Sequence, residues 1–344
     1  MIIDAYAHML NSKYIDRLVE KGGKWTRGKA EQLSATVQRK PYFVDVAQRL
    51  KHLEGNGIDF QVVAPHHTWD CNIVPGGIAT QMAYARTLND SMASLMEESK
   101  GKLIGTGSIP LAGMEEGGRQ EMERAINTLG LKAFFTLSNI NGEPLDAFEP
   151  FLAQAAEMNI PVYFHPMDPA SGAGRSYEAE YGLIHDFGWP FETALILSRL
   201  VFSGIMERYP TLKVMCHHLG GGFIPFYMGR SAETHSKDKE NPENFGVKWG
   251  VGFTEGGGSV PKLPFDYFKR FYWDTAVGGS APAIRCTYEV FGADPILFGT
   301  DYPMMMDGDY RLREYPKVIE SLGLPEEDKK KIFAGNARRM LNLD

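Results

Sequence analysis

The chain has 344 residues, a formal net charge of −7 and a sequence pI near 5.8. Its lysines and arginines are dispersed, so binding to nucleic acid or to an anionic membrane is not expected. Three widely spaced cysteines without a CxxC pair indicate a reducing compartment without structural disulfides. The chain shows no signal peptide at its start, and no apolar run approaches the roughly 18 residues that span a bilayer. These features predict a cytoplasmic enzyme.

In the first half of the chain, short apolar segments alternate with segments of helical periodicity. Four strands are expected: 2–5, 60–64, 103–109 and 131–137. Helices are expected between them: 43–54, 78–99 and 115–129. Residues 11–41 are mixed in character and contain three glycines, so an irregular excursion above the first strand is expected there.

The alternation continues in the second half. Four more strands are expected: 161–164, 212–216, 270–273 and 296–298. The expected helices follow the same rhythm: 145–159, 191–208, 281–291, 310–322 and 326–334. Residues 236–264 are polar and contain three consecutive glycines, which predicts a long loop. This loop lacks the Lys-Ser/Thr that follows the glycines of a phosphate loop.

Eight apolar strands separated by helices predict an α/β fold, a single (β/α)8 TIM barrel over residues 1–344. A doubly wound open sheet is the competing fold. It would place a glycine-rich turn after the first strand, where this chain has Tyr6-Ala7-His8-Met9.

Six of the nine histidines fall at predicted strand ends: His8, His66, His67, His165, His217 and His218. Asp274 and Asp301 end the seventh and eighth strands. The C-terminal strand ends form the catalytic face of such a barrel. Imidazoles and a carboxylate that converge there can hold a divalent metal such as Zn²⁺. Taken singly, each histidine could be a packing residue and Asp301 a cap of the next helix or turn.

A second distinctive segment is His66-His67-Thr68-Trp69-Asp70, which follows the second strand. Two imidazoles and an indole suit an aromatic or acidic substrate, through hydrogen bonds and stacking. The alternative is a loop that only packs over the mouth of the barrel.

Four motifs in order resemble the amidohydrolase superfamily: Asp4-x-x-x-His8, Phe164-His165-Pro166, His218-x-Gly220-Gly221-Gly222 and Gly299-Thr300-Asp301-Tyr302-Pro303. More narrowly, the chain resembles the branch typified by α-amino-β-carboxymuconate-ε-semialdehyde decarboxylase and γ-resorcylate decarboxylase. The resemblance covers essentially the whole chain. It implies that His8, His165 and Asp301 bind one divalent metal ion, zinc or else manganese. It also implies that His218 and Asp301 are catalytic.

Two arginines match carboxylate-binding residues of the resembled branch. Arg230 would reach into the site of a neighbouring subunit, which implies a homodimer or a larger homo-oligomer. Arg39 matches more loosely, and a surface or helix-packing role is the alternative for it.

Tyr6 departs from the family pattern, which has His or Glu in its place. A neutral phenol is a poor metal ligand, because its proton has a pKa of about 10. The site would then have one protein ligand fewer, a tyrosinate, or a substitute such as His66 or His67, and a binuclear centre is not expected. Tyr6 is retained as a substrate-binding candidate.

The resemblance implies non-oxidative decarboxylation of a small unsaturated or aromatic carboxylic acid. A hydrolase or hydratase acting on a lactone, an amide or a conjugated acid is the alternative with the same ligands. A third possibility, supported by Tyr6 alone, is a catalytically inactive partner subunit.

Overall fold

The computed structural model describes residues 1–167, 180–222, 224–226, 260–262, 264–304 and 308–343. Eight strands form one sheet in the order β1-β2-β3-β4-β7-β8-β9-β10, and every neighbouring pair is parallel. Their bounds are Ile3–His8, Phe60–Ala64, Leu103–Gly107, Ala133–Leu137, Val162–His165, Val214–Cys216, Tyr272–Asp274 and Ile296–Leu297. Two short strands, Asn139–Ile140 (β5) and Glu143–Pro144 (β6), form a separate hairpin.

Backbone hydrogen bonds join the last strand to the first. The amide of Ala5 donates to the carbonyl of Phe298 (2.7 Å), and the amide of His8 donates to the carbonyl of Tyr302 (2.7 Å). Asp301 donates its amide to the carbonyl of Tyr6 (2.9 Å). The sheet thus closes into a barrel, and the (β/α)8 prediction is confirmed.

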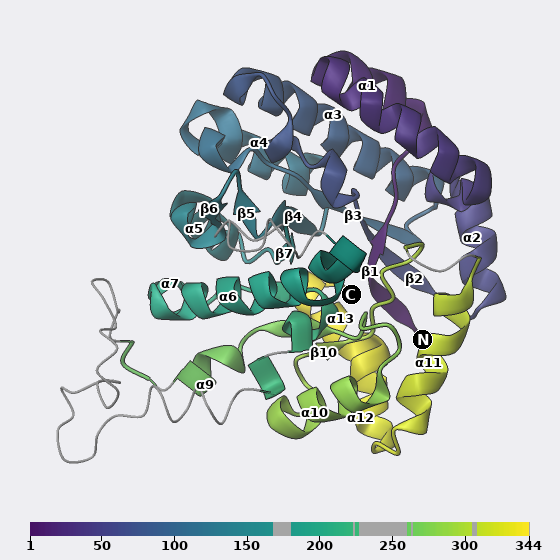
Figure 1. Ribbon diagram of the computed structural model, residues 1–344, viewed down its shortest axis with the longest axis vertical. Helices are drawn as coiled ribbons and strands as arrows, with labels where there is room; N and C mark the ends of the chain where they lie inside the picture. Colours follow the sequence, from purple (N-terminus) through teal and green to yellow (C-terminus); the bar gives the residue numbers. More distant parts are fainter. Residues whose placement is uncertain (168–179, 223, 227–259, 263, 305–307, 344) are drawn as a thin grey trace.

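Helices surround the strands (Figure 1). Before β7 they are α1 to α5: Ile15–Arg39, Val46–Gly55, Gly77–Glu98, Arg119–Glu123 and Glu149–Glu157. After β7 the described helices are α6, α7 and α9 to α13: Trp189–Phe202, Ile205–Arg208, Pro264–Phe268, Ala281–Phe291, Tyr310–Ser321, Glu326–Lys330 and Asn336–Leu341. No helix in these described ranges is long and apolar enough to cross a bilayer.

The expectation of an irregular excursion over residues 11–41 is wrong, because α1 occupies most of it. Gly23 adopts φ 64° and ψ −145°, a conformation open to glycine, so the helix kinks there and then resumes. Leu18 and Leu33, one on each side of the kink, are buried, and α1 packs on α3. The glycines therefore kink this helix, and it continues on both sides of the kink. Most of the loop predicted for 236–264 lies outside the described residues.

A buried polar network lies beneath the rim, by which we mean the C-terminal ends of the strands. Arg49 of α2 donates to the side chain of Gln61 (2.8 Å) and to the carbonyl of His8 (2.6 Å). Gln61 in turn donates to the carboxyl group of Asp4 (2.7 Å). This network pins the end of β1 and fixes the position of His8.

Candidate active site

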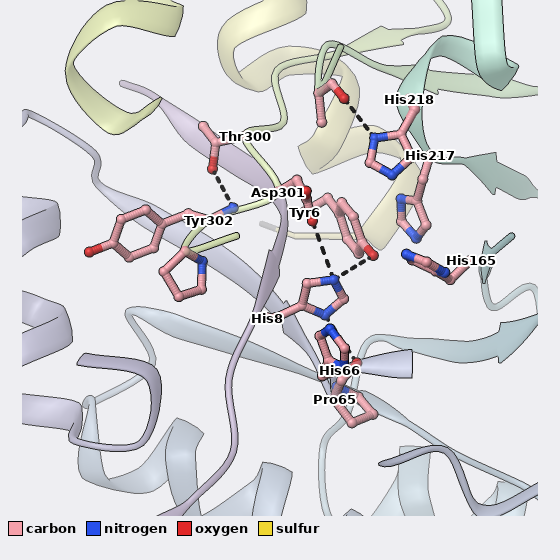
Figure 2. A network of polar contacts seen from close by, with 12 residues as sticks. Tyr6, His8, Pro65, His66, His165, His217, His218, Thr300, Asp301 and Tyr302 are labelled. Atoms are coloured by element: carbon pink, nitrogen blue, oxygen red, sulfur yellow. Dashed lines mark hydrogen bonds and ion pairs between the residues drawn. The ribbon is translucent and has the colours of Figure 1, made fainter. Parts of the chain in front are cut away.

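The strand ends bring together most of the predicted site residues (Figure 2). Described residues enclose a cavity of about 800 Å³ at the rim. Six of the site residues predicted from the sequence line this cavity: His8, His66, His67, His165, His218 and Asp301. Side chains converge here from β1, β7 and the segments after β2, β8 and β10, as expected for a barrel active site.

Two histidines are held by backbone carbonyl groups. Nδ1 of His8 bonds the carbonyl of Pro65 (3.1 Å), and Nδ1 of His165 bonds the carbonyl of Pro166 (2.6 Å). A carbonyl only accepts, so Nδ1 carries the proton and Nε2 of the neutral ring keeps its lone pair. Burial, reinforced by neighbouring histidines, lowers the pKa of His165 well below its ordinary value. Such a ring has the form that ligates a metal.

Asp301 follows β10 and adopts φ 55°. Nη1 of Arg311, on α11, donates to Oδ2 of Asp301 (2.8 Å) and to the carbonyl of Thr300 (2.9 Å). Burial alone would raise the pKa of Asp301, but a hydrogen bond from Nε2 of His8 in its protonated form and the charge of Arg311 outweigh burial and lower that pKa. The carboxylate is therefore ionised. It does not cap α11, whose N-cap is Asp309.

Nε2 of His8 lies 3.3 Å from Oδ1 of Asp301. In the neutral form of His8 both atoms are acceptors. Two acceptors this close can share a proton or a metal cation. The two imidazoles and one carboxylate are donors that suit a divalent ion. The rings of His8 and His165 lie 6.0 Å apart, and no three His, Cys, Asp or Glu side chains in the described ranges form a ready-made metal site. The donor types therefore fit a metal, although His165 stands apart from the other two donors.

Tyr6 is buried and lies beside His8. Its hydroxyl donates to Nε2 of His8 (2.9 Å), the same atom that faces Asp301 (Figure 2). Burial and the charges of Asp301 and Asp274 raise the pKa of Tyr6 well above 10, so the side chain is a neutral phenol. This argues against the tyrosinate alternative. Tyr6 does not line the cavity that the described residues form.

Asp274 organises the two histidines after β8. Its carboxylate accepts from the backbone amide of His218 (2.8 Å) and bonds Nδ1 of His217 (3.1 Å). Nδ1 of His218 bonds the carbonyl of Ala276 (2.6 Å), and His218 lines the cavity. The ring of His217 instead stacks on Tyr6, with 3.3 Å between centroids. The chain thus separates a cavity-facing histidine from one that packs behind it.

The segment after β2 divides between two roles. His66 and His67 line the cavity, and the ring of His67 stacks on that of His165 with 4.3 Å between centroids. Trp69 is buried and lines a smaller adjoining cavity. Part of this segment therefore faces the main cavity and part is buried, and substrate binding by it stays a prediction.

Of the two candidate arginines, only Arg39 is described, and it is not brought to the site. Arg39 is exposed at the end of α1 and lines neither this cavity nor the adjoining one. Arg230 lies outside the described residues.

Several cavity-lining residues were missed from the sequence, among them Arg311, His185 and Trp189. His185 and Trp189 are four residues apart, a spacing that places two side chains on the same helical face, and their rings lie 4.1 Å apart. That spacing was the available signal. Arg311 carries no comparable signal, because nothing in its surrounding sequence distinguishes it from Arg313.

Comparison with known proteins identifies the family. Residues 36–343 match the family model described as amidohydrolase. This chain belongs to the amidohydrolase family. The chain is 30% identical over 265 residues to the 2-amino-3-carboxymuconate-6-semialdehyde decarboxylase of Dictyostelium discoideum, covering 76% of this chain and 67% of that relative. It is 28% identical over 272 residues to a gamma-resorcylate decarboxylase of Polaromonas sp., covering 76% of each.

A solved structure of 5-carboxyvanillate decarboxylase from Novosphingobium aromaticivorans, complexed with manganese and 4-hydroxy-3-methoxy-5-nitrobenzoic acid, has the same fold. The TM-score is 0.83 at 22% identity, over 100% of this chain and 96% of that chain. The family model and the relatives confirm the family resemblance seen in the sequence, and those relatives are named as decarboxylases.

Proposed function

We propose that this amidohydrolase is a metal-dependent, non-oxidative decarboxylase of a small aromatic or unsaturated carboxylic acid. The observation that carries the proposal is an ionised Asp301 beside the backbone-anchored imidazole of His8. The anchored imidazole of His165 lines the same cavity of about 800 Å³, which is large enough for such an acid. The decarboxylase names of the relatives support this reaction over the others.

One divalent metal ion would be held by His8, His165 and Asp301. Zinc, expected first from the sequence, and manganese, present in the related structure, are both proposed. When bound, such an ion supplies Lewis-acid stabilisation of negative charge on substrate oxygens.

The reaction breaks the bond between the carboxylate and its carbon, leaves the electron pair on that carbon and requires a proton to replace CO2. Asp301 is ionised in the free protein, so it must take up a proton before it can deliver one. His218 points its Nδ1 to the carbonyl of Ala276, which leaves Nε2 for proton transfer at the cavity. We assign this transfer to Asp301 or His218, and the orientation of Asp301 to Arg311.

Metal content and CO2 release test the proposal together. Metal should be measured by inductively coupled plasma mass spectrometry on wild type, His165→Ala and, as a control histidine that does not line the described cavity, His52→Gln. We expect about one equivalent of zinc or manganese in wild type and in the control, and loss in His165→Ala. The absence of metal from wild type, together with no turnover, would support an inactive partner subunit.

Substrate screening should begin with the acids named for the relatives: γ-resorcylate, 5-carboxyvanillate and 2-amino-3-carboxymuconate-6-semialdehyde. CO2 release that depends on the metal is the expected result. Turnover of lactones or amides without CO2 release would replace decarboxylation with hydrolysis. Carboxylate binding by Arg230, the homo-oligomer that it implies and the cytoplasmic location stay predictions.

A further inference from the structure

A smaller cavity of about 270 Å³, called here the side cavity, adjoins the main one. His66 and Met304 line both cavities. Lys29 and Thr36 line the side cavity from α1, and Trp69 lines it from the turn after β2. The shared wall makes the side cavity a natural extension of the substrate site.

Two lysines line this cavity: Lys40, whose Nζ donates to the carbonyl of Pro303 (2.8 Å), and Lys29. The side chain of Lys29 is partly buried, and its Nζ lies 5.5 Å from the centroid of the Trp25 ring. Among the described residues, no carboxylate forms an ion pair with it. Burial and neighbouring histidines lower the pKa of His66 well below its ordinary value, so its ring is neutral. Lys29 and His66 both line the side cavity, and an anion placed there would be stabilised by the ammonium group.

His66 adds a hydrogen-bond donor at the junction. Its Nδ1 accepts from the backbone amide of Thr68 (3.4 Å) and contacts the Thr68 hydroxyl (2.8 Å). Nδ1 is thus an acceptor, so the proton of the neutral ring lies on Nε2. Leu33 and Phe43 form an apolar wall of the side cavity. A cation, a ring N–H donor and apolar walls suit an acidic group carried on a short apolar arm.

We propose that the side cavity binds an acidic substituent of the substrate, with Lys29 as its counter-ion. This inference rests on the proposed function, because the reacting carboxylate occupies the main cavity. It narrows the substrate class to aromatic or unsaturated acids that carry a second anionic group. Lys29 is then a specificity-determining residue, separate from the proton-transfer groups Asp301 and His218.

Binding measurements test this inference without turnover. Isothermal titration calorimetry on the manganese-loaded protein should compare benzoate with benzene-1,3-dicarboxylate and 3-(carboxymethyl)benzoate. We expect wild type to bind at least one diacid about tenfold more tightly than benzoate. Lys29→Met should lower that preference severalfold, with Lys40 still present, and Lys29→Arg should keep most of it. Lys24→Met, an exposed lysine on the same helix, should match wild type.

Salt gives a readout that needs no variant. Raising the salt concentration from about 50 to about 500 mM should weaken diacid binding by wild type severalfold more than benzoate binding. Equal affinity for all three probes, no binding of any probe, or an unchanged preference in Lys29→Met would overturn the inference. Failure of the proposed function is distinguishable, because it would appear as absent CO2 release while the diacid preference persists.

Discussion

Two buried carboxyl groups, Asp4 inside the barrel and Asp301 at its rim, show opposite behaviour. Asp4 accepts hydrogen bonds from Gln61 (2.7 Å) and the Thr300 hydroxyl (2.6 Å), both neutral donors. Burial outweighs these bonds and raises the pKa of Asp4 to about 6. Asp301 contacts a guanidinium group, and its pKa falls. In this barrel the contacts that a buried carboxyl group makes, with His8 and Arg311 or with neutral donors, decide whether its pKa falls or rises.

Asp4 and Asp301 therefore have different roles. Asp4 holds the neighbouring strands together through neutral hydrogen bonds and can keep its proton in weakly acidic solution. Asp301 carries its charge at the cavity wall, where a metal or a proton can be received. His8 and Arg311 together create this difference, since both contact the carboxylate of Asp301.

The largest effect is expected from Asp301→Asn, which removes the charge at the rim and keeps the shape. Asparagine retains an oxygen for Arg311, so the fold should survive. Turnover should fall by at least about 1,000-fold, because proton transfer and metal binding both lose the carboxylate. CO2 release measures activity, and circular dichroism checks the fold. Retained activity would remove Asp301 from the mechanism.

Arg311→Met tests how much the Arg311 guanidinium stabilises the ionised carboxylate of Asp301. In the metal-free protein this variant leaves a buried carboxylate without its cation, which costs about 3–5 kcal/mol. Urea unfolding at pH 7 with a chelator present should report that loss. Arg311→Lys keeps a positive charge and should recover part of the stability. A loss below about 1 kcal/mol in Arg311→Met would show that another group holds Asp301 ionised.

Asp4 predicts a pH dependence of stability. Its pKa is raised in the folded state from 3.8 to about 6, so the folded state binds the proton more tightly than the unfolded state. The stability that this contributes is full below about pH 3.8 and is lost as the pH rises through about 6, a change of about 3 kcal/mol.

Urea unfolding between pH 4 and 7 should be compared for wild type and Asp4→Asn. The variant should lack this component of the slope, whatever its absolute stability. Asp16→Asn, which changes an exposed carboxyl group on α1, serves as the control and should keep the wild-type slope. The same slope in Asp4→Asn as in wild type would contradict the raised pKa.

The sequence was sufficient for the barrel and for most of its rim, because strands and helices have distinct periodicities and polar residues stand where the strands end. It misled over α1, since Gly22 and Gly23 resemble a break, whereas the buried faces on both sides keep the helix. The sequence could not show that the pKa of Asp4 rises and that of Asp301 falls. That difference depends on His8 and on Arg311, and Arg311 reaches the rim only when α11 folds back on the barrel.

The smallest effect concerns Tyr6, which lies between the two carboxyl groups: its amide contacts Asp4 (3.3 Å), and its carbonyl accepts from the amide of Asp301 (2.9 Å). The Tyr6 hydroxyl occupies the Nε2 lone pair of His8 that a metal would need. Tyr6→Phe removes that competitor and keeps the ring on His217. We expect manganese affinity, measured by calorimetry, to rise by up to about tenfold. A tyrosinate ligand predicts the reverse, so weaker metal binding by Tyr6→Phe would mean that the phenol, despite its raised pKa, ionises onto the metal.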